Sequence, residues 1–320
     1  MVYIILFLIS FSLTYIIKNY MIKKSLVASV NERSSHTIPT PHGGGIAITI
    51  TWFIGLFYLY FAGQIEQNLF YALLFGAVIS IVSFFDDIYE LSPKLRLIVQ
   101  ALIATGGLYF LGGFETLTFG IFDIQNHIFT NIFAFFMIIW FINLYNFLDG
   151  INGYAGSEAV FLAVAGFILF GGNHFLVLAM AVLGFLYWNW NKAKIFMGDV
   201  GSTLLGYNIA IFTIYYTNQE PTNFWLWIIL FGVYWFDATL TLLRRKLNKE
   251  KLSQAHKKHA YQRLTQAGWS HYKVTNYSIG LNLLLFLIVY FVSNTFLAFV
   301  LSMILLVLSM KFVDSKKRFE

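Results

Sequence analysis

The sequence lacks cysteine and is poor in charge. None of its 320 residues is cysteine, and only 11% are Asp, Glu, Lys or Arg. The first absence excludes disulfides and thiolate metal sites. The second, together with 58% hydrophobic residues and a mean hydropathy of +0.70, excludes a soluble domain of ordinary proportions, because its core could not enclose so many apolar side chains. We therefore expect a protein that crosses a membrane several times.

Long apolar runs recur along the whole chain. A helix needs about 20 mostly apolar residues to cross a hydrocarbon layer ~30 Å thick. No basic residue precedes the first run and no small-residue cleavage signal follows it, so we expect a retained helix rather than a signal peptide. The predicted fold class is all-α, a polytopic integral membrane protein with about 11 transmembrane helices. The expected spans cover residues 2–18, 44–62, 68–85, 97–112, 129–147, 158–172, 174–190, 203–217, 223–243, 276–292 and 294–310.

Basic residues are confined to alternate connections between these runs. All 21 Lys and Arg fall within residues 18–33, 94–96, 192–194, 244–273 and 311–318. By the positive-inside rule these segments are cytoplasmic, so the N-terminus is periplasmic and the C-terminus is cytoplasmic. The net charge of +6 then reflects topology and does not indicate nucleic-acid binding. We expect a single transmembrane domain over residues 1–320, with cytoplasmic active-site loops at 19–43, 86–96, 148–158, 191–202 and 244–275.

Two adjacent carboxylates end one of the apolar runs. Asp86 and Asp87 follow the stretch "VISIVSFF" and should lie near the cytoplasmic interface. A helix that simply ends in polar residues is one interpretation. Adjacent carboxylates repel each other, however, and Lys94, Arg96 or a divalent cation could offset that repulsion. Mg²⁺ fits this role, because it prefers oxygen ligands and commonly takes only one or two protein carboxylates.

Two further acids on the same side are flanked by glycine. Asp149 begins "DGINGYAG", and Asp199 lies in "FMGDVGSTLLG". Glycine lets the backbone approach a ligand closely, and free N–H groups at the start of a helix suit phosphate. Ordinary turns use the same residues, so each string alone is weak evidence. Acids brought to one membrane face by three separate connections are a stronger indication of a site.

Basic side chains could complement these acids. If the string "QAHKKHAYQRL" is helical, His256, His259 and Arg263 fall on one face. Phosphate binding fits their charge. A solvated surface helix and a basic face on anionic lipid are the alternatives, and a zinc site lacks further ligands at the usual spacing.

Two other features allow more than one interpretation. Asp237 lies seven residues before Arg244, so it forms either a structural ion pair with that arginine or part of a site. The segment "NERSSHTIPTPHGGG" combines Arg33, His36 and His42 with three glycines. We interpret it as a loop that borders a phosphate site, although a plain connection into the next helix would look similar.

Taken together, these strings resemble a known family. "DDIYELSPKLRLIVQ", "NLYNFLDGINGYAG", "FMGDVGSTLLG" and "HKKHAYQRL" follow the order found in the polyprenyl-phosphate N-acetylhexosamine-1-phosphate transferases, the MraY/WecA-like group of glycosyl transferase family 4. The chain looks most like the branch that starts O-antigen or related surface polysaccharides. The peptidoglycan-precursor branch has three consecutive histidines where this chain reads His-Lys-Lys-His over residues 256–259, which makes that role less favoured.

The resemblance implies a reaction and its participants. N-acetylhexosamine 1-phosphate would pass from a UDP-sugar to undecaprenyl phosphate at the cytoplasmic face of the bacterial inner membrane, yielding an undecaprenyl-diphosphate-sugar and UMP. Mg²⁺ is the implied cofactor, with Mn²⁺ as a substitute, and a homodimer is the implied assembly. The implied roles are catalysis for Asp86, Asp87 and Asp199, metal binding for Asp199 and Asp87, and substrate binding for Lys94, Asn146, Asp149, Asn152, His256, His259 and Arg263.

One position departs from the family pattern. The third motif in most relatives reads Asp-Gly-x-Asp-Gly, and here the second acid is Asn152. An amide removes a charge but keeps a hydrogen-bonding group, which affects the expected donor more than the reaction class. The alternatives are a phospho-N-acetylmuramoyl-pentapeptide transferase of peptidoglycan synthesis, a silent relative that binds the lipid carrier, and an ion-coupled transporter. A transporter would place its acids near the bilayer midplane and relate its halves by a repeat, and the sequence suggests neither.

Overall fold

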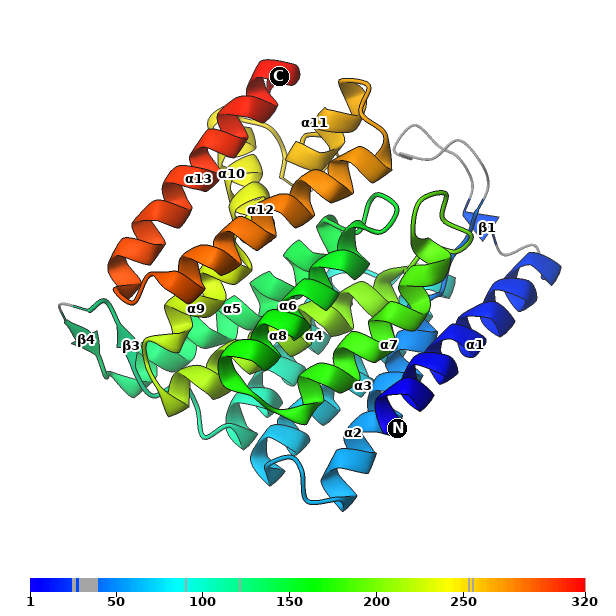
Figure 1. The fold of residues 1–320 in the computed structure, drawn as a ribbon, viewed down its shortest axis with the longest axis horizontal. Coiled ribbons are helices and arrows are strands. Elements are labelled where there is room, and N and C mark those ends of the chain that lie inside the picture. Colours follow the sequence, from blue (N-terminus) through cyan, green and yellow to red (C-terminus); the bar gives the residue numbers. More distant parts are fainter. Residues whose placement is uncertain are drawn as a thin grey trace.

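The apolar runs fold as long helices, joined by short connections and two small β-ribbons (Figure 1). The computed structural model describes residues 1–24, 27–28, 40–89, 91–120, 122–252, 254 and 256–319. Arg33 and His36, which we expected beside a phosphate site, lie outside these described residues. The helices are α1 (Val2–Lys23), α2 (Gly45–Phe61), α3 (Gln67–Tyr89), α4 (Pro93–Phe110), α5 (His127–Phe147), α6 (Tyr154–Phe170), α7 (Asn173–Asn189), α8 (Asp199–Gln219), α9 (Asn223–Leu230), α10 (Gly232–Leu247), α11 (Ala260–Gln266), α12 (His271–Phe291) and α13 (Thr295–Lys316). The antiparallel ribbons pair β1 (Val27–Ala28) with β2 (Thr40–Pro41), and β3 (Leu117–Thr118) with β4 (Asp123–Ile124).

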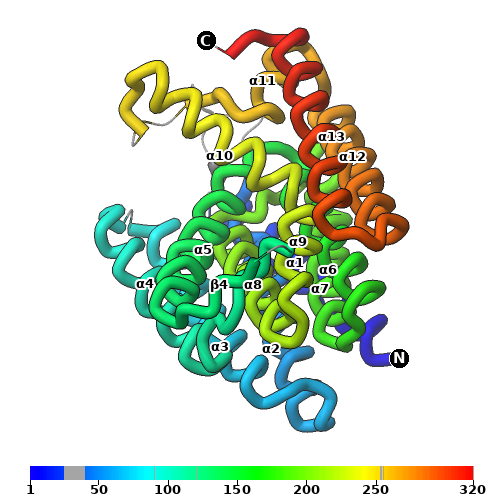
Figure 2. Tube along the Cα trace, turned by 90° about the vertical axis from the view of Figure 1, so that its left-hand side faces the viewer, coloured from blue at the N-terminus to red at the C-terminus, as the bar shows by residue number. Residues whose placement is uncertain are grey.

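The helices confirm the all-α membrane class. Each expected span coincides with a helix or, for residues 223–243, with the pair α9 and α10. Within the described part of the chain, five helices are long and apolar enough to cross a membrane, and six if the bent pair is one span. The two termini lie at opposite ends of the molecule (Figure 2). The number of crossings and the orientation remain predictions.

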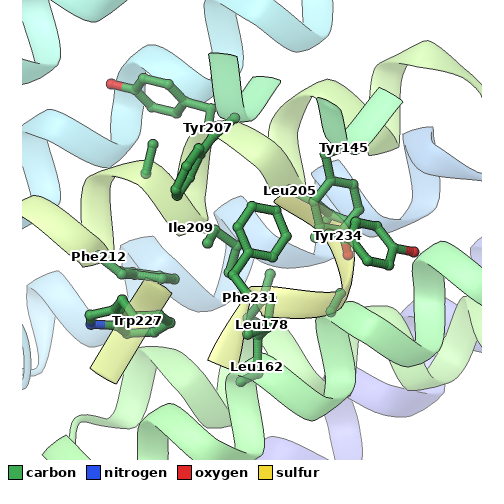
Figure 3. Close-up of a cluster of buried hydrophobic side chains, with 14 of the residues drawn as sticks. Tyr145, Leu162, Leu178, Leu205, Tyr207, Ile209, Phe212, Trp227, Phe231 and Tyr234 are labelled. Carbon is green, nitrogen blue, oxygen red and sulfur yellow. The ribbon is translucent and has the colours of Figure 1, made fainter. Parts of the chain in front are cut away.

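The span expected over residues 223–243 is not one continuous helix. α9 and α10 meet at Phe231 with a bend of 73°. Phe231 is fully buried against Phe141, with ring centroids 4.9 Å apart, inside the aromatic cluster of Figure 3. The carbonyl of Ile228, in the last turn of α9, accepts a hydrogen bond from Nε1 of Trp235 at 2.7 Å. A break at membrane depth is tolerated when protein covers it and satisfies the backbone, and both conditions hold here.

α8 is the central helix of the bundle. It packs against α2, α3, α5, α6 and α9, and every residue from Val200 to Ile214 is buried. At Gly206 an added Cβ would lie 2.5 Å from the carbonyl oxygen of Phe141, so glycine lets α5 and α8 approach closely. The first residue of α8 is Asp199. The packing of the central helix therefore fixes the position of this carboxylate.

Candidate active site

The turn before α8 is held by the glycine-rich loop that precedes α2. The N–H groups of Gly44 and Gly45 donate to the carbonyls of Phe196 and Met197 at 2.9 and 2.8 Å. A Cβ on Gly45 would collide with the backbone N and Cα of Gly201. The run of glycines is therefore required by the contact of two backbones, and that contact sets where α8 begins.

His42 lies in this same loop and close to the start of α8. Burial lowers the pKa of His42, and the nearby charge of Asp199 opposes the shift. The loop thus borders an acidic centre, and the phosphate site that we expected beside it stays a prediction.

Backbone N–H groups of the α8 turn reach two carboxylates from elsewhere in the chain. Gly198 has a φ of +75°, a conformation that glycine adopts readily. Its N–H lies close to Asp149, and the N–H of Asp199 lies close to Asp87. One turn therefore joins acids from α3, from the connection between α5 and α6, and from α8.

Like charges surround Asp149. Protein packed around this partly exposed side chain raises the pKa of Asp149 well above its usual range, and the charges of Asp199 and Asp87 raise it further. The hydrogen bond from Gly198 acts in the opposite direction. A cation placed among these carboxylates would relieve their mutual repulsion.

Asp86 forms an ion pair with Arg96. Its Oδ2 lies 3.1 Å from Nη1 of Arg96, and its Oδ1 accepts from the N–H of Leu91 at 2.7 Å. Arg96 thus offsets part of the repulsion between Asp86 and Asp87. Lys94, the other basic residue that we considered for this role, is exposed on the first turn of α4.

Side-chain amides extend the polar region along α5. Asn146 hydrogen-bonds to Asp199, and its Oδ1 accepts from Oγ of Ser202 at 3.1 Å. One turn earlier, Asn143 donates to Gln100 at 2.7 Å. We had assigned roles to neither Asn143 nor Gln100. The available signal was the spacing of Asn143 and Asn146, which places two amides on one face of an apolar helix.

A cavity of about 570 Å³ lies beside these groups. Its polar lining includes Asp86, Arg96, Asn146, Asp199, His256 and His259. Its apolar lining includes Ile79, Val82, Leu97, Phe147, Leu242 and Leu252. Asp87 and Asp149 are joined to this wall through the turn before α8. The cavity therefore offers both charged and hydrocarbon surface in one place.

The two histidines reach the cavity from a segment that is not helical. The condition under which His256, His259 and Arg263 would share one helix face is not met, because α11 begins at Ala260 and His259 is its N-cap residue. The rings of His256 and His259 are 4.9 Å apart. Burial, followed by the influence of His259 and Arg245, lowers the pKa of His256 to about 4, so this imidazole is neutral at neutral pH.

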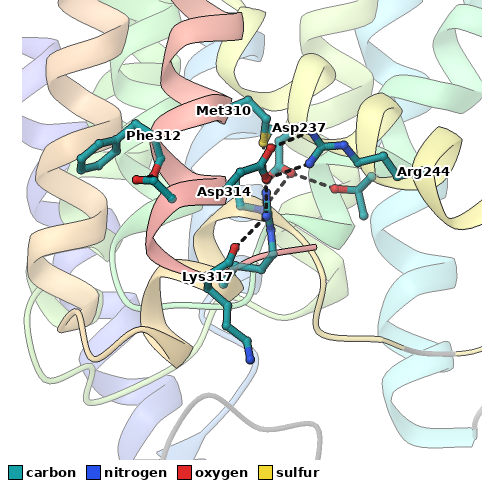
Figure 4. A network of polar contacts seen from close by, with 10 residues as sticks. Asp237, Arg244, Met310, Phe312, Asp314 and Lys317 are labelled. Carbon is teal, nitrogen blue, oxygen red and sulfur yellow. Dashed lines mark hydrogen bonds and ion pairs between the residues drawn. The ribbon is translucent and has the colours of Figure 1, made fainter. Parts of the chain in front are cut away.

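Arg263 does not line the cavity with these histidines. Its Nη1 lies 2.6 Å from Oδ1 of Asp314 and 3.0 Å from the carbonyl of Lys317. Arg244 binds the same carboxylate through two contacts of 2.9 and 2.8 Å (Figure 4). The structure therefore gives Arg263 a place between α11 and α13 rather than beside phosphate. Because residues 256–259 precede α11, Arg263 does not share a helix face with His256 and His259.

Of the two interpretations of Asp237, the structure does not show the ion pair with Arg244. Arg244 binds Asp314, and Asp237 accepts from the N–H of Ala260 instead. Sequence spacing alone could not show this, because the competing partners come from α11 and α13.

Asn152 lies between the Asp149 connection and α12. Its N–H approaches Nδ1 of His271 at 3.5 Å, and its carbonyl accepts from Oγ1 of Thr275 at 3.0 Å. Its side-chain Oδ1 is buried and has no hydrogen-bond partner among the described residues. Such a group marks a point where a ligand or an ordered water would be stabilised by donating a hydrogen bond.

The acids fit a metal ion that shares its ligands with a substrate. In the part of the chain that the structure describes, no three His, Asp or Glu side chains converge closely enough to hold an ion by themselves. Mg²⁺ commonly takes one or two carboxylates and completes its shell with water and phosphate oxygens. Asp199 and Asp87 are partly exposed and linked through one turn, so they fit that requirement.

Known proteins provide an independent comparison. Residues 69–217, from α3 to α8, match the pattern of glycosyl transferase family 4. A probable undecaprenyl-phosphate N-acetylglucosaminyl 1-phosphate transferase of Bacillus subtilis (strain 168) is 32% identical over 273 residues, which cover 81% of this chain and 75% of that protein. An undecaprenyl-phosphate alpha-N-acetylglucosaminyl 1-phosphate transferase of Thermotoga maritima is 27% identical over 79% and 78% of the two chains. A phospho-N-acetylmuramoyl-pentapeptide-transferase of Streptococcus pneumoniae is 30% identical over 77% and 82%. The chain is therefore a member of glycosyl transferase family 4.

Proposed function

We propose that this membrane protein transfers an N-acetylhexosamine 1-phosphate from a UDP-sugar to undecaprenyl phosphate. The observation that carries the proposal is the cavity, whose lining combines carboxylates and histidines with a run of apolar side chains. Undecaprenyl phosphate likewise combines a charged phosphate group with a long hydrocarbon tail. The names of the similar proteins from B. subtilis and T. maritima support this acceptor.

The proposed reaction exchanges one phosphoanhydride bond for another. An oxygen of the lipid phosphate attacks the phosphorus that carries the sugar. The bond from that phosphorus to the bridging oxygen breaks, and the oxygen leaves with UMP. Both substrates are anions, so the site must lower the repulsion between them as they meet.

The acids and the histidines would lower this repulsion in different ways. We assign Asp199 as the principal Mg²⁺ ligand, with Asp87 as the second, and the ion would supply positive charge between the two phosphates. Asp86, in contact with Arg96, helps to place that arginine at the cavity wall. His256 and His259 face the same cavity, where they would donate hydrogen bonds to the diphosphate.

The apolar lining gives the lipid tail a route. Leu97 on α4 and Leu242 on α10 belong to the wall of the cavity, and Leu97 is also exposed at the surface of the molecule. The tail would leave between α4 and α10 while its phosphate stays near Asp199. We place the site at the cytoplasmic face of a bacterial inner membrane, in agreement with the distribution of Lys and Arg.

The proposal also concerns the identity of the donor sugar and the biosynthetic pathway. We favour an N-acetylhexosamine donor and a first membrane step in O-antigen or related envelope polysaccharide synthesis. The second candidate is phospho-N-acetylmuramoyl-pentapeptide transfer, because the S. pneumoniae relative carries that name.

A donor panel tests the proposal directly. Purified protein in lipid nanodiscs with undecaprenyl phosphate and Mg²⁺ is expected to release UMP from at least one of UDP-GlcNAc, UDP-GalNAc, UDP-FucNAc and UDP-QuiNAc. UDP-N-acetylmuramoyl-pentapeptide in the same panel distinguishes the second candidate. UMP is measured with and without the lipid, because transfer requires the acceptor and simple hydrolysis does not. The proposal would be refuted if no donor led to UMP release in nanodiscs in which a known transferase of this kind is active.

A further inference from the structure

Asp237 is a buried carboxylate on α10 that reaches the start of α11. Its side chain is about 4% exposed. Each of its two oxygens lies 2.9 Å from the N of Ala260, and Oγ1 of Thr241 donates to Oδ1 at 3.0 Å. Arg244 and Arg263, two nearby arginines, both bind Asp314 (Figure 4). A buried carboxylate needs a charged or hydrogen-bonding partner, and for Asp237 that partner comes from the start of α11.

The ring of His259 is held in one orientation beside this carboxylate. Nδ1 of His259 lies 3.7 Å from Oδ1 of Asp237, and the imidazole is only 3% exposed. The rings of Phe147 and Tyr261 are stacked with it at centroid distances of 6.5 and 6.0 Å, with interplanar angles of 25° and 9°. The aromatic rings fix the plane of the imidazole, and Asp237 faces one of its two nitrogens. Nε2 is therefore the nitrogen left for the cavity that His259 lines.

α10 also fixes the segment that leads to this histidine. Arg245, which is 2% exposed, donates from Nη2 to the carbonyls of Lys251 and Gln254 at 2.7 and 3.1 Å, and its Nε lies 3.1 Å from Glu250. The chain from residue 250 to residue 260 is thus attached to α10 at both of its ends. The position of the imidazole follows α10, so a carboxylate on α10 is well placed to orient it.

We propose that Asp237 is a positioning residue for the transfer reaction, which holds a proton on Nδ1 of His259 and thereby directs Nε2 to the substrate phosphates. A carboxylate that accepts from one imidazole nitrogen sets the tautomer and the direction of the other. The separation of 3.7 Å is longer than a hydrogen bond, and contacts of this kind commonly shorten when substrate binds. The inference rests on the proposed function, in which His259 meets the diphosphate.

A double-mutant cycle separates this role from simple capping of α11. Asp237→Asn keeps an oxygen for the N–H of Ala260 but removes the charge that faces His259. We expect Asp237→Asn to lower kcat/KM for the UDP-sugar by about 10- to 100-fold, as supporting residues of histidines commonly do. In the His259→Ala background the same change is expected to have no further effect, because Asp237 acts through that imidazole. An equal further loss in that background would show that Asp237 acts only on the fold and would overturn the proposal.

A control and a second measurement complete the test. Thr241→Val removes a hydrogen bond to Asp237 without removing its charge, and kcat/KM is expected to stay within about threefold of the wild type. The tautomer of His259 can be measured without turnover, from the ¹⁵N chemical shifts of histidine-labelled protein. The signal that is lost in His259→Ala identifies His259. We expect these shifts to indicate Nδ1–H in the wild type and to change in Asp237→Asn. The same tautomer in both proteins would also overturn the proposal. Failure of the proposed function looks different, since wild-type protein would then release no UMP from any donor while the tautomer result still stands.

Discussion

Asp199→Asn is expected to lower UMP release at least about 100-fold, a loss typical of removing one group that stabilises transition-state charge. Asp199 is the first residue of the central helix, contacts Asn146, and lines the cavity. The amide keeps the size of the side chain and can still accept the hydrogen bond from Asn146. It removes the negative charge that would hold Mg²⁺ against the substrate phosphates. The measurement is the initial rate at saturating donor and lipid over a range of Mg²⁺ concentrations.

Asp123→Asn is the matched control for this change. Asp123 is an exposed acid in β4, remote in sequence from every site residue, so its loss is expected to leave the rate unchanged. An Asp199→Asn protein that retains a third or more of wild-type activity would remove Asp199 from the metal site. Removal of the divalent cation with a chelator should abolish release by the wild type, and added Mg²⁺ should restore it.

Gly45→Ala is expected to damage both stability and activity. The new Cβ would meet the backbone of Gly201, which has no flexible side chain to move aside. Overpacking of this kind costs about 1–3 kcal/mol and more where two backbones must separate. We expect the midpoint of thermal unfolding in detergent to fall by about 5 °C or more. Activity should fall further than stability alone explains, because the start of α8 would shift and carry Asp199 with it.

Gly280→Ala provides the comparison. Gly280 lies within α12, and a Cβ added there meets no atom within 4 Å. Alanine is also the better helix former, by about 1 kcal/mol, so the midpoint should stay the same or rise slightly. Equal effects of the two substitutions would contradict the close contact between the loop before α2 and the turn before α8.

The helices could be predicted because the bilayer imposes a length on every apolar run. The break at Phe231 could not. No proline or polar residue marks it, and the sequence around it reads as one apolar segment. What stabilises the break is tertiary, namely the packing of Phe231 on Phe141 and the hydrogen bond from Trp235 to Ile228.

The acids of the site could be predicted as a group, but their partners could not. Charge distribution predicted Asp86, Asp87, Asp149 and Asp199 on one face, and in the structure Asp87, Asp149 and Asp199 lie around the turn before α8, while Asp86 binds Arg96. The start of α11 at Ala260 could not be predicted from the sequence, because its N-cap residue is a histidine rather than a serine, threonine or aspartate. Asp237 accepts the hydrogen bond from the first N–H of α11, and it lies 23 residues away on another helix. Such a contact cannot be predicted from local sequence, and neither can the separation of Arg263 from the two histidines.

The turn at Gly198 has a consequence for how the length of this chain can vary. Two consecutive peptide N–H groups there lie close to carboxylates from two other parts of the chain. One inserted residue in the first turn of α8 would rotate everything before it by about 100° about the helix axis and separate all three acids at once. Residues 196–201 should therefore tolerate substitution at some positions but no insertion or deletion.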